Sequence, residues 1–289
     1  MIALNHNSIS DIRELLEQRG IALKKRFGQN FLVSEGVRRR IGGLIGEELA
    51  GLGRRGDGAG NGEVWEVGPG LGALTDELIR LGLTGRLRLF EIDRGIVNFL
   101  KDRYNGEILL EEGDFLHTFA ALTAAPGFSP PAMVVGNLPY NSAGAIIPAI
   151  VESALPVPAM VFLLQQEMVD RLRAEPGVKA YGAVTVLVQS HYRVNQVLSV
   201  APGSFYPVPQ VDSSLAVFRQ RSDRPAPQAA AVISQVARAA FSQRRKTLRT
   251  TLRPYLNELE TCGIDSSLRG EVLFPEQYRA IAAEILRRR

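Results

Sequence analysis

The sequence predicts an α/β protein with a seven-stranded, mostly parallel sheet and a small all-helical region at its C-terminal end. Short apolar runs, bounded by turn residues, alternate with longer runs of helical periodicity. The early apolar runs are nearly continuous, as expected for parallel strands that helices cover on both faces. Beyond residue 220 only helical patterns remain. These observations together indicate one sheet domain followed by a helical one.

Seven runs are expected to form strands: Val64–Val67, Leu87–Ile92, Ile108–Glu111, Met133–Gly136, Met160–Leu164, Gln196–Val200 and Leu215–Phe218. Seven others are expected to form helices: Ala73–Leu81, Gly95–Tyr104, Ala143–Ser153, Glu167–Ala174, Gly182–Gln189, Ala229–Gln243 and Glu276–Arg289. A Pro-rich loop, and no crossover helix, separates the last two strands. We therefore expect an antiparallel excursion at one edge of the sheet.

Two polar segments divide the chain. Residues 219–228 contain two prolines and predict a linker, which places the domains at residues 1–220 and 221–289. Residues 51–62 contain six glycines and are expected to form a mobile loop.

Composition narrows the class of protein. At 45% apolar and 22% charged residues, the chain is typical of a soluble globular protein. Its single cysteine, Cys262, excludes an intramolecular disulfide and a thiolate cluster for zinc, so no metal site is expected. No apolar run approaches the roughly 20 residues of a membrane span. Acidic residues near the N-terminus argue against a secretory leader. We expect a cytoplasmic protein without membrane association.

The positive charge is concentrated at one end. Residues 221–289 carry 13 Lys and Arg against 7 Asp and Glu, whereas residues 1–220 carry 21 against 23. An excess of this kind is expected where a protein contacts a polyanion such as RNA. A solvated basic helix surface explains the charge equally well.

A glycine-rich turn follows the first strand and opens a helix. Its sequence, Glu66-Val-Gly-Pro-Gly-Leu-Gly72, lets the backbone turn sharply and lets a ligand approach main-chain atoms. The Gly68-x-Gly70-x-x-Ala73 spacing also fits a nicotinamide dinucleotide site, and a purely structural turn is a third interpretation.

Acidic residues follow the next two strands. Glu91, about 20 residues beyond the glycines, is placed to bind ribose hydroxyls in either cofactor class. Asp114 after the third strand suits the amine of an adenine, which dinucleotide enzymes do not generally need. Pro69 removes one amide donor that a pyrophosphate would use. The pattern therefore favours S-adenosylmethionine over NAD, although each acid alone is more often a turn or N-cap residue.

The fourth strand ends in Asn137-Leu138-Pro139-Tyr140. Such a turn places an amide, a carbonyl and an aromatic ring at the edge of the sheet. The acceptors can orient the hydrogens of an exocyclic amine while Tyr140 stacks on its base. Together with an upstream donor site, this predicts methyl transfer to a nucleobase nitrogen. An ordinary strand-ending turn is the alternative, because X-Pro often ends regular structure.

Five segments together resemble one family, the KsgA (RsmA) ribosomal RNA adenine dimethyltransferases. They are Lys24–Leu32 (KKRFGQNFL), Glu66–Thr75 (EVGPGLGALT), Asn137–Tyr140, Phe205–Ser213 (FYPVPQVDS) and Arg244–Arg249 (RRKTLR). The resemblance runs in order from about residue 21 to residue 278. It implies a class I, Rossmann-like S-adenosylmethionine-dependent methyltransferase domain. Its substrate would be two adjacent adenosines near the 3′ end of small-subunit rRNA, each dimethylated at N6, with a role in small-subunit biogenesis.

The resemblance also implies roles for individual residues. Residues 1–30 would supply an N-terminal helix and a segment that contacts RNA and the donor. Donor contacts would fall on Asn30, Leu32, Gly68, Gly70, Glu91, Asp114 and Asn137. The acceptor adenine would meet Asn137, Leu138, Pro139 and Tyr140, with Phe205 on its other face. RNA contacts would fall on Lys24, Lys25, Arg26, Arg244, Arg245, Lys246 and Arg249. The spacing of Arg245 and Arg249 predicts that they share a helical face.

The sequence departs from the family pattern in three places. The glycine-rich insert at residues 51–62 is long, Ala143-Gly144 follows the Asn-Leu-Pro-Tyr turn, and Gln210 stands where Lys is common. None removes a group with an assigned chemical role.

Three other functions compete with the preferred one. They are methylation of large-subunit rRNA, a non-enzymatic ribosome-assembly factor, and an NAD dehydrogenase. The last would need an acid or base for hydride transfer, but His6, His117 and His191 lie in no recognisable motif and are expected at surface or capping positions. The preferred partner is the small ribosomal subunit or its precursor, bound by a monomeric enzyme.

Overall fold

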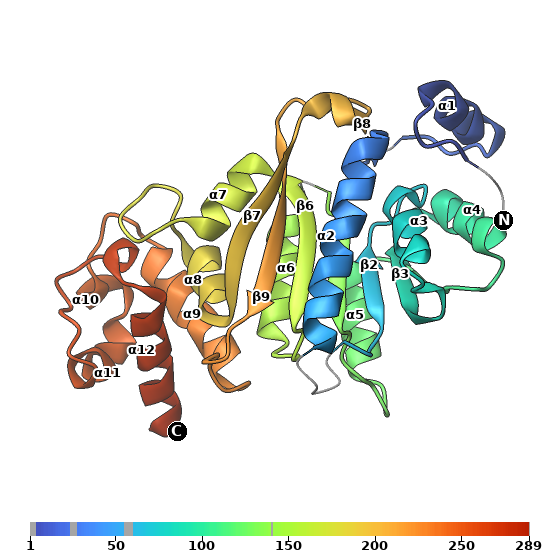
Figure 1. Ribbon diagram of the computed structural model, residues 1–289. Helices are drawn as coiled ribbons and strands as arrows, with labels where there is room; N and C mark the ends of the chain where they lie inside the picture. Colours follow the sequence, from blue (N-terminus) through green and yellow to red (C-terminus); the bar gives the residue numbers. More distant parts are fainter. Residues whose placement is uncertain (1–3, 24–27, 55–59, 140, 289) are drawn as a thin grey trace. The chain divides into compact units, whose positions relative to one another are not determined.

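The computed structural model describes residues 4–23, 28–54, 60–139 and 141–288 (Figure 1). Its main sheet has seven strands in the order β4-β3-β2-β5-β6-β9-β7. The strands are β2 (Val64–Val67), β3 (Leu87–Glu91), β4 (Leu109–Glu112), β5 (Met133–Asn137), β6 (Ala159–Gln165), β7 (Tyr192–Val200) and β9 (Ser213–Gln220). A separate antiparallel pair joins β1 (Phe31–Leu32) to β8 (Phe205–Tyr206). All seven expected strands therefore form, within a few residues of their predicted bounds.

Strands β2 to β6 are parallel. β2 pairs with β3 and β5, β3 pairs with β4, and β5 pairs with β6. β7 and β9 occupy the opposite edge from β4. Because parallel strands point the same way, the carboxyl ends of β2 to β5 meet at one edge of the sheet.

Twelve α-helices lie within the described residues. They are α1 (Ile9–Gln18), α2 (Glu35–Gly53), α3 (Ala73–Arg80), α4 (Arg94–Tyr104), α5 (Phe115–Thr123), α6 (Ala143–Glu152), α7 (Gln166–Arg173), α8 (Ala183–His191), α9 (Ala229–Phe241), α10 (Leu248–Thr251), α11 (Leu256–Thr261) and α12 (Pro275–Arg287). α2, α5, α10 and α11 were not expected from their sequences. α2 and α5 lie on opposite faces of the sheet at β2 (Figure 1).

The core lies on both faces of the sheet. On one face, Trp65 of β2 contacts Phe90 of β3 at 5.2 Å between ring centroids, and Phe119 of α5 lies 6.2 Å from Trp65. On the other face, Val64 belongs to a cluster of buried side chains with Ile41 and Ile45 of α2. Alternation of side chains along each strand explains this division, and it confirms that the central strands are buried on both sides.

The chain forms two compact units, each built from several segments. The first unit contains residues 1–143, 157–166 and 196–217; the second contains residues 144–156, 167–195 and 218–289. In the second unit, α9 packs against α8 and α12. Because the units do not divide the chain at one point, the boundary at residue 220 stays a prediction.

Two predicted loops are partly structured. Residues 51–53 of the glycine-rich insert form the last turn of α2, and Arg86 donates to the carbonyl oxygens of Gly60 and Gly62. Residues 55–59 lie outside the described residues. The predicted linker at 219–228 begins inside β9, and Asp223 within it forms ion pairs with Arg221 and Arg279. The linker prediction holds for residues 221–228, which form turns and irregular structure, whereas Arg219 and Gln220 belong to β9.

Candidate active site at the carboxyl ends of the strands

The predicted donor residues gather at one edge of the sheet. The Gly68–Gly72 turn follows β2, Glu91 ends β3, Asp114 follows β4 and Asn137 ends β5. The strand registers place these ends side by side, since Val67 pairs with Phe90 and Glu91 with Glu112. Sequence spacing alone predicted this arrangement, and the structure confirms it.

The turn after β2 requires glycine. Gly68, Gly70 and Gly72 all have positive φ angles, of 69°, 55° and 84°. A side chain at Gly72 would overlap with the hydroxyl of Tyr104, and a Cβ at Gly70 would lie 3.2 Å from the ring of Phe31. The turn therefore brings bare backbone close to the Asn30–Leu32 segment. Backbone exposed in this way fits a ligand that binds main-chain atoms.

Glu91 is tied to the same turn. Its side chain is buried at 5% exposure, and Oε2 accepts a hydrogen bond from the Gly70 amide at 3.2 Å. Oε1 accepts from the Asp93 amide at 2.8 Å. Burial raises the pKa of Glu91 to about 7, although these amide bonds favour the ionised form. The carboxylate is a hydrogen-bond acceptor next to the turn, as ribose binding requires.

Glu66 is a second buried acid in the donor site. Its side chain is 1% exposed and accepts a hydrogen bond from Oγ1 of Thr75 at 2.7 Å. Burial raises the pKa of Glu66 to about 8, with further contributions from the charges of Asp76 and Glu91. Glu66 belongs to the glycine motif in the sequence, but no role was predicted for it. Two buried acids, Glu66 and Glu91, therefore lie near the glycine turn, and Glu66 has no basic partner among the described residues.

Asp114 has a local role in the structure. It is exposed and forms the N-cap of α5, where its Oδ1 accepts from the Leu116 amide at 2.9 Å. Its contact with an adenine stays a prediction.

Asn137 is oriented by the segment that precedes β1. Its Nδ2 donates a hydrogen bond to the backbone carbonyl of Asn30 at 2.8 Å. With the amine end used in this way, Oδ1 is the part of the amide that can accept a hydrogen bond from a substrate amine. The backbone carbonyl of Asn137 lies 3.9 Å from the position of a Cβ on Gly68. Donor turn and acceptor amide are therefore neighbours.

The rest of the Asn-Leu-Pro-Tyr turn starts α6. Leu138 is 1% exposed and its amide donates to the carbonyl of Leu163, while the carbonyl of Pro139 accepts from the amides of Ser142 and Ala143. Tyr140 lies outside the described residues, so its stacking stays a prediction.

The short β1–β8 pair joins two segments that are far apart in the sequence. Leu32 pairs with Phe205 and Phe31 with Tyr206. Phe205 is 1% exposed and belongs to the hydrophobic core with Phe31 and Leu32. Its ring has almost no accessible face, so this arrangement gives Phe205 a packing role and does not support the predicted stacking on a base.

The basic residues fall into three groups. Lys24, Lys25 and Arg26 lie outside the described residues. Arg244 donates to Oε2 of Glu271 at 2.8 Å and to the carbonyl of Val178. Arg245, Lys246 and Arg249 are exposed.

The predicted helical face of Arg245 and Arg249 is wrong. α9 ends at Phe241, Arg245 lies in a turn and Arg249 lies in α10. The i,i+4 argument fails because the helix does not continue through Thr247, whose extended backbone caps α10.

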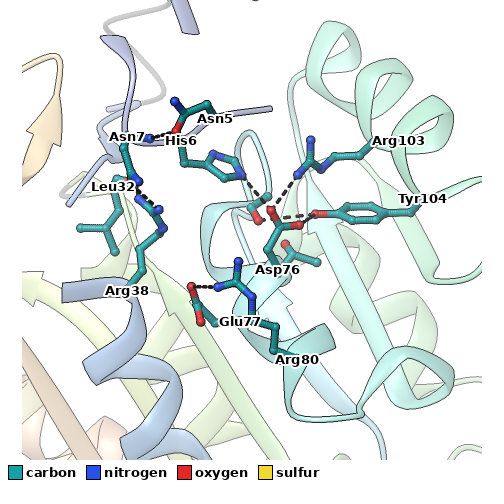
Figure 2. A network of polar contacts seen from close by, with 12 residues as sticks. Asn5, His6, Asn7, Leu32, Arg38, Asp76, Glu77, Arg80, Arg103 and Tyr104 are labelled. Carbon is teal, nitrogen blue, oxygen red and sulfur yellow. Dashed lines mark hydrogen bonds and ion pairs between the residues drawn. The ribbon is translucent and has the colours of Figure 1, made fainter. Parts of the chain in front are cut away.

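Two histidines also differ from expectation. His6 and His191 are both buried, at 6% exposure, whereas surface or capping positions were predicted. His6 lies 3.0 Å from Asp76 in a network of polar contacts (Figure 2).

Within the described residues, no helix has both the length and the apolar character to cross a membrane. In the same part of the chain, no three His, Cys, Asp or Glu side chains are grouped so as to bind a metal ion.

Comparison with protein families decides between the remaining classes. The family model described as ribosomal RNA adenine dimethylase matches residues 20–273. This chain belongs to that family. The family contains methyltransferases, and the NAD dehydrogenase is thereby excluded.

Curated relatives match nearly the whole chain. A ribosomal RNA small subunit methyltransferase A of Aromatoleum aromaticum is 40% identical over 267 residues, covering 89% of this chain and 92% of the relative. The protein of the same name from Burkholderia thailandensis is 37% identical over 271 residues, covering 92% and 94%.

Solved structures agree on the fold. The 23S rRNA methyltransferase ErmE has a TM-score of 0.57 and 23% identity, covering 88% of this chain and 99% of its own. A dimethyladenosine transferase from Plasmodium falciparum has the same TM-score and 22% identity, covering 78% and 90%. Together with the sheet order, these similarities confirm a class I, Rossmann-like methyltransferase fold with a helical C-terminal region.

Proposed function

We propose that this protein dimethylates N6 of two adjacent adenosines in the 3′-terminal hairpin of small-subunit rRNA, using S-adenosylmethionine. Its relatives are named for the small subunit, and its family is that of the adenine dimethylases. The observation that carries the proposal is the Asn137 amide, which is held by Asn30 beside the glycine turn. The 23S rRNA methyltransferase ErmE shares the fold but, at 23% identity, does not favour a large-subunit substrate.

The residues at the strand ends fit S-adenosylmethionine. This donor supplies a methyl group already activated by the positive charge on sulfur. Buried Glu91 is placed to accept from ribose hydroxyls, and Asp114 from the adenine amine. Bare backbone at Gly68 and Gly70, with Asn30 and Leu32 opposite, would hold the remainder. The excess of acids over bases at this edge suits a cationic ligand better than a pyrophosphate.

Asn137 and Leu138 would make the acceptor nitrogen reactive. The lone pair of an adenine amine is delocalised into the ring, which makes it a weak nucleophile. Hydrogen bonds from its two N–H groups to Oδ1 of Asn137 and to the carbonyl of Leu138 favour a pyramidal nitrogen. The lone pair then points at the methyl group. The proton is lost after transfer, so no strong base is required.

Correct positioning of the adenine amine and the methyl group would supply most of the acceleration of methyl transfer. Correct orientation of two reactants lowers a barrier by up to about 7–11 kcal/mol in well-oriented systems. Tyr140 would stack on the base, a contact worth about 1–3 kcal/mol. Pro139 fixes the turn between these groups. The adenine must leave its own stack before it can enter the site.

RNA binding would rest on basic residues in two parts of the chain. These are Lys24, Lys25 and Arg26, and Arg244, Arg245, Lys246 and Arg249. Such contacts engage phosphates and make affinity depend on salt. We further propose a monomeric, cytoplasmic enzyme that meets its substrate within the small ribosomal subunit or a precursor of it.

The decisive experiment compares subunits as substrates. Purified protein is incubated with S-adenosylmethionine and with unmethylated small or large subunits, and the rRNA is digested for mass spectrometry. We expect two N6,N6-dimethyladenosines in adjacent positions of the small-subunit rRNA. Modification confined to the large subunit, or none with either, would overturn the proposal.

A further inference from the structure

The segment that precedes α1 lies against the helix that follows the glycine turn (Figure 2). Nε2 of His6 lies 3.0 Å from Oδ2 of Asp76, which is in the first turn of α3. Both side chains are shielded, at 6% and 18% exposure. His6 and Asp76 are 70 positions apart, so this contact exists only because the N-terminal segment folds back onto α3.

Asp76 connects this contact to the turn itself. Its Oδ2 also accepts from Nη2 of Arg103 at 2.7 Å, and its Oδ1 accepts from the hydroxyl of Tyr104 at 2.9 Å. That hydroxyl fills the space in which a side chain at Gly72 would lie. Burial would raise the pKa of Asp76, but the bonds from His6, Arg103 and Tyr104 hold it below its ordinary value. The contact with His6 is therefore made to a carboxylate, which strengthens it.

The next residue reaches the other wall of the donor site. Oδ1 of Asn7 accepts a hydrogen bond from Nη2 of Arg38 at 2.5 Å (Figure 2). Arg38 is buried and its Nη1 donates to the carbonyl oxygens of Leu32 and Val33, at 3.3 and 2.9 Å. Arg38 thus fixes the end of β1 through two hydrogen bonds, and Asn7 in turn fixes the guanidinium group of Arg38.

We propose that His6 and Asn7 are positioning residues for the methyl donor, which set the glycine turn and the Asn30–Leu32 segment at the separation that the donor needs. His6 and Asn7 are consecutive residues of one turn, closed by the Ser8 amide donating to the Asn5 carbonyl, and each is bonded to one wall, so a single peptide unit limits the distance between the walls. Neither residue need touch the donor, because each acts through Asp76 or Arg38. The inference deepens the proposed function and rests on it.

The test measures binding of S-adenosylhomocysteine to the full chain by isothermal titration calorimetry. The variants are His6→Ala and Asn7→Ala, with His6→Gln to restore a hydrogen bond to Asp76. Gln18→Ala is the matched control, because Gln18 is exposed on α1 and its side chain donates to Glu14 of the same helix, its one side-chain hydrogen bond within the described residues. Thermal unfolding without ligand shows whether each variant folds.

We expect Kd to rise about ten-fold for His6→Ala and Asn7→Ala, equivalent to ~1.4 kcal/mol, and to return to within about two-fold for His6→Gln. Gln18→Ala should bind as the parent does. In methylation assays the KM for S-adenosylmethionine should rise while kcat at saturation changes less than about two-fold. The reason is that these variants leave Asn137, which acts on the acceptor amine, unchanged.

A purely structural role gives a different result. If the alanine variants unfold at lower temperature but, where folded, bind with unchanged Kd, the inference is overturned and the proposed function stands. Failure of the parent protein to bind the ligand would instead overturn the donor assignment of the proposed function. A fall in kcat with unchanged KM would also contradict the inference, because it would place His6 on the acceptor side.

Discussion

Two buried carboxylates of the first unit differ from an exposed carboxylate of the second. Glu66 and Glu91 of the first unit are buried, neither has a basic partner among the described residues, and burial raises the pKa of each. In the second unit, Asp223 is exposed and two arginines, Arg221 and Arg279, hold its pKa below the ordinary value through hydrogen bonds. Other carboxylates of the first unit do have basic partners: Arg103 and His6 bind Asp76, and Arg88 binds Glu63.

This difference indicates what each unit binds. Desolvated acids without cations are costly in the free protein, and a cationic ligand would relieve that cost. The first unit is therefore suited to the sulfonium and ammonium groups of the donor. In the second unit Asp223 is already paired with two arginines, whereas Arg245, Lys246 and Arg249 are exposed and would be available to phosphates. Variants in either unit can test the contrast.

The largest effect is expected for Asn137→Ala. The variant loses the acceptor Oδ1 and the bond to Asn30, so kcat for methylation should fall at least about 100-fold, as for loss of a group that acts on the reacting atoms. Affinity for S-adenosylhomocysteine should stay within several-fold, because the acids of the donor site remain. Single-turnover methylation and calorimetry measure the two quantities. Full activity would remove Asn137 from the mechanism.

The next effect concerns the pH dependence of donor binding. Because the pKa of Glu91 is about 7 in the free protein, its ionised form is lost as pH falls below that value. A protonated carboxyl cannot accept from both ribose hydroxyls. Affinity for S-adenosylhomocysteine should therefore fall up to about ten-fold per pH unit below 7 and level off above it. Calorimetry from pH 5.5 to 8.5 measures this, and Glu91→Gln should bind weakly at every pH.

RNA affinity should distinguish exposed from ion-paired basic residues in the second unit. Arg245 and Lys246 are exposed in the turn after α9, so replacing both with Ala should weaken binding several-fold and reduce the salt dependence by about two counterions. Arg244→Ala is the comparison, because Arg244 is paired with Glu271. It should lower the unfolding temperature and change the salt slope less. Equal slopes for both variants would contradict the division between paired and available basic residues.

The smallest effect is on stability. The pKa of Glu66 is about 8 in the folded protein and near 4.5 when unfolded, so between these values the folded state binds more protons. Stability should then fall as pH rises from about 4.5 to 8. Glu66→Gln removes this loss, and without ligand it should unfold a few degrees above the parent at pH 9 but close to it at pH 5. A difference independent of pH would show that Glu66 is not protonated in the fold.

Local patterns were sufficient for much of the fold and donor site. Apolar runs located all seven strands of the main sheet. The turn residues that follow them were correctly expected at one edge, because parallel strands bring their carboxyl ends together, and a donor site there stays a prediction. Predictions failed where local pattern and packing disagree. α2 contains six glycines, which weaken a helical pattern, yet it forms against α3, where Gly42 allows close approach to Glu77. The predicted helix Ala229–Gln243 ends at Phe241, so Arg245 and Arg249 do not share a helical face.

The sequence by itself determined which groups are available: a glycine turn, acids after successive strands, and an amide at the end of β5. Tertiary structure alone decided how they are held. It paired β1 with β8 across more than 170 positions, which buried Phe205, and it placed His6 on Asp76 and the Asn137 amide on Asn30. The physical reason is the distance along the chain over which each kind of interaction acts. Periodicity and turn chemistry act over a few residues, whereas the orientation of a side chain in a site depends on partners that only the folded chain brings within hydrogen-bonding distance.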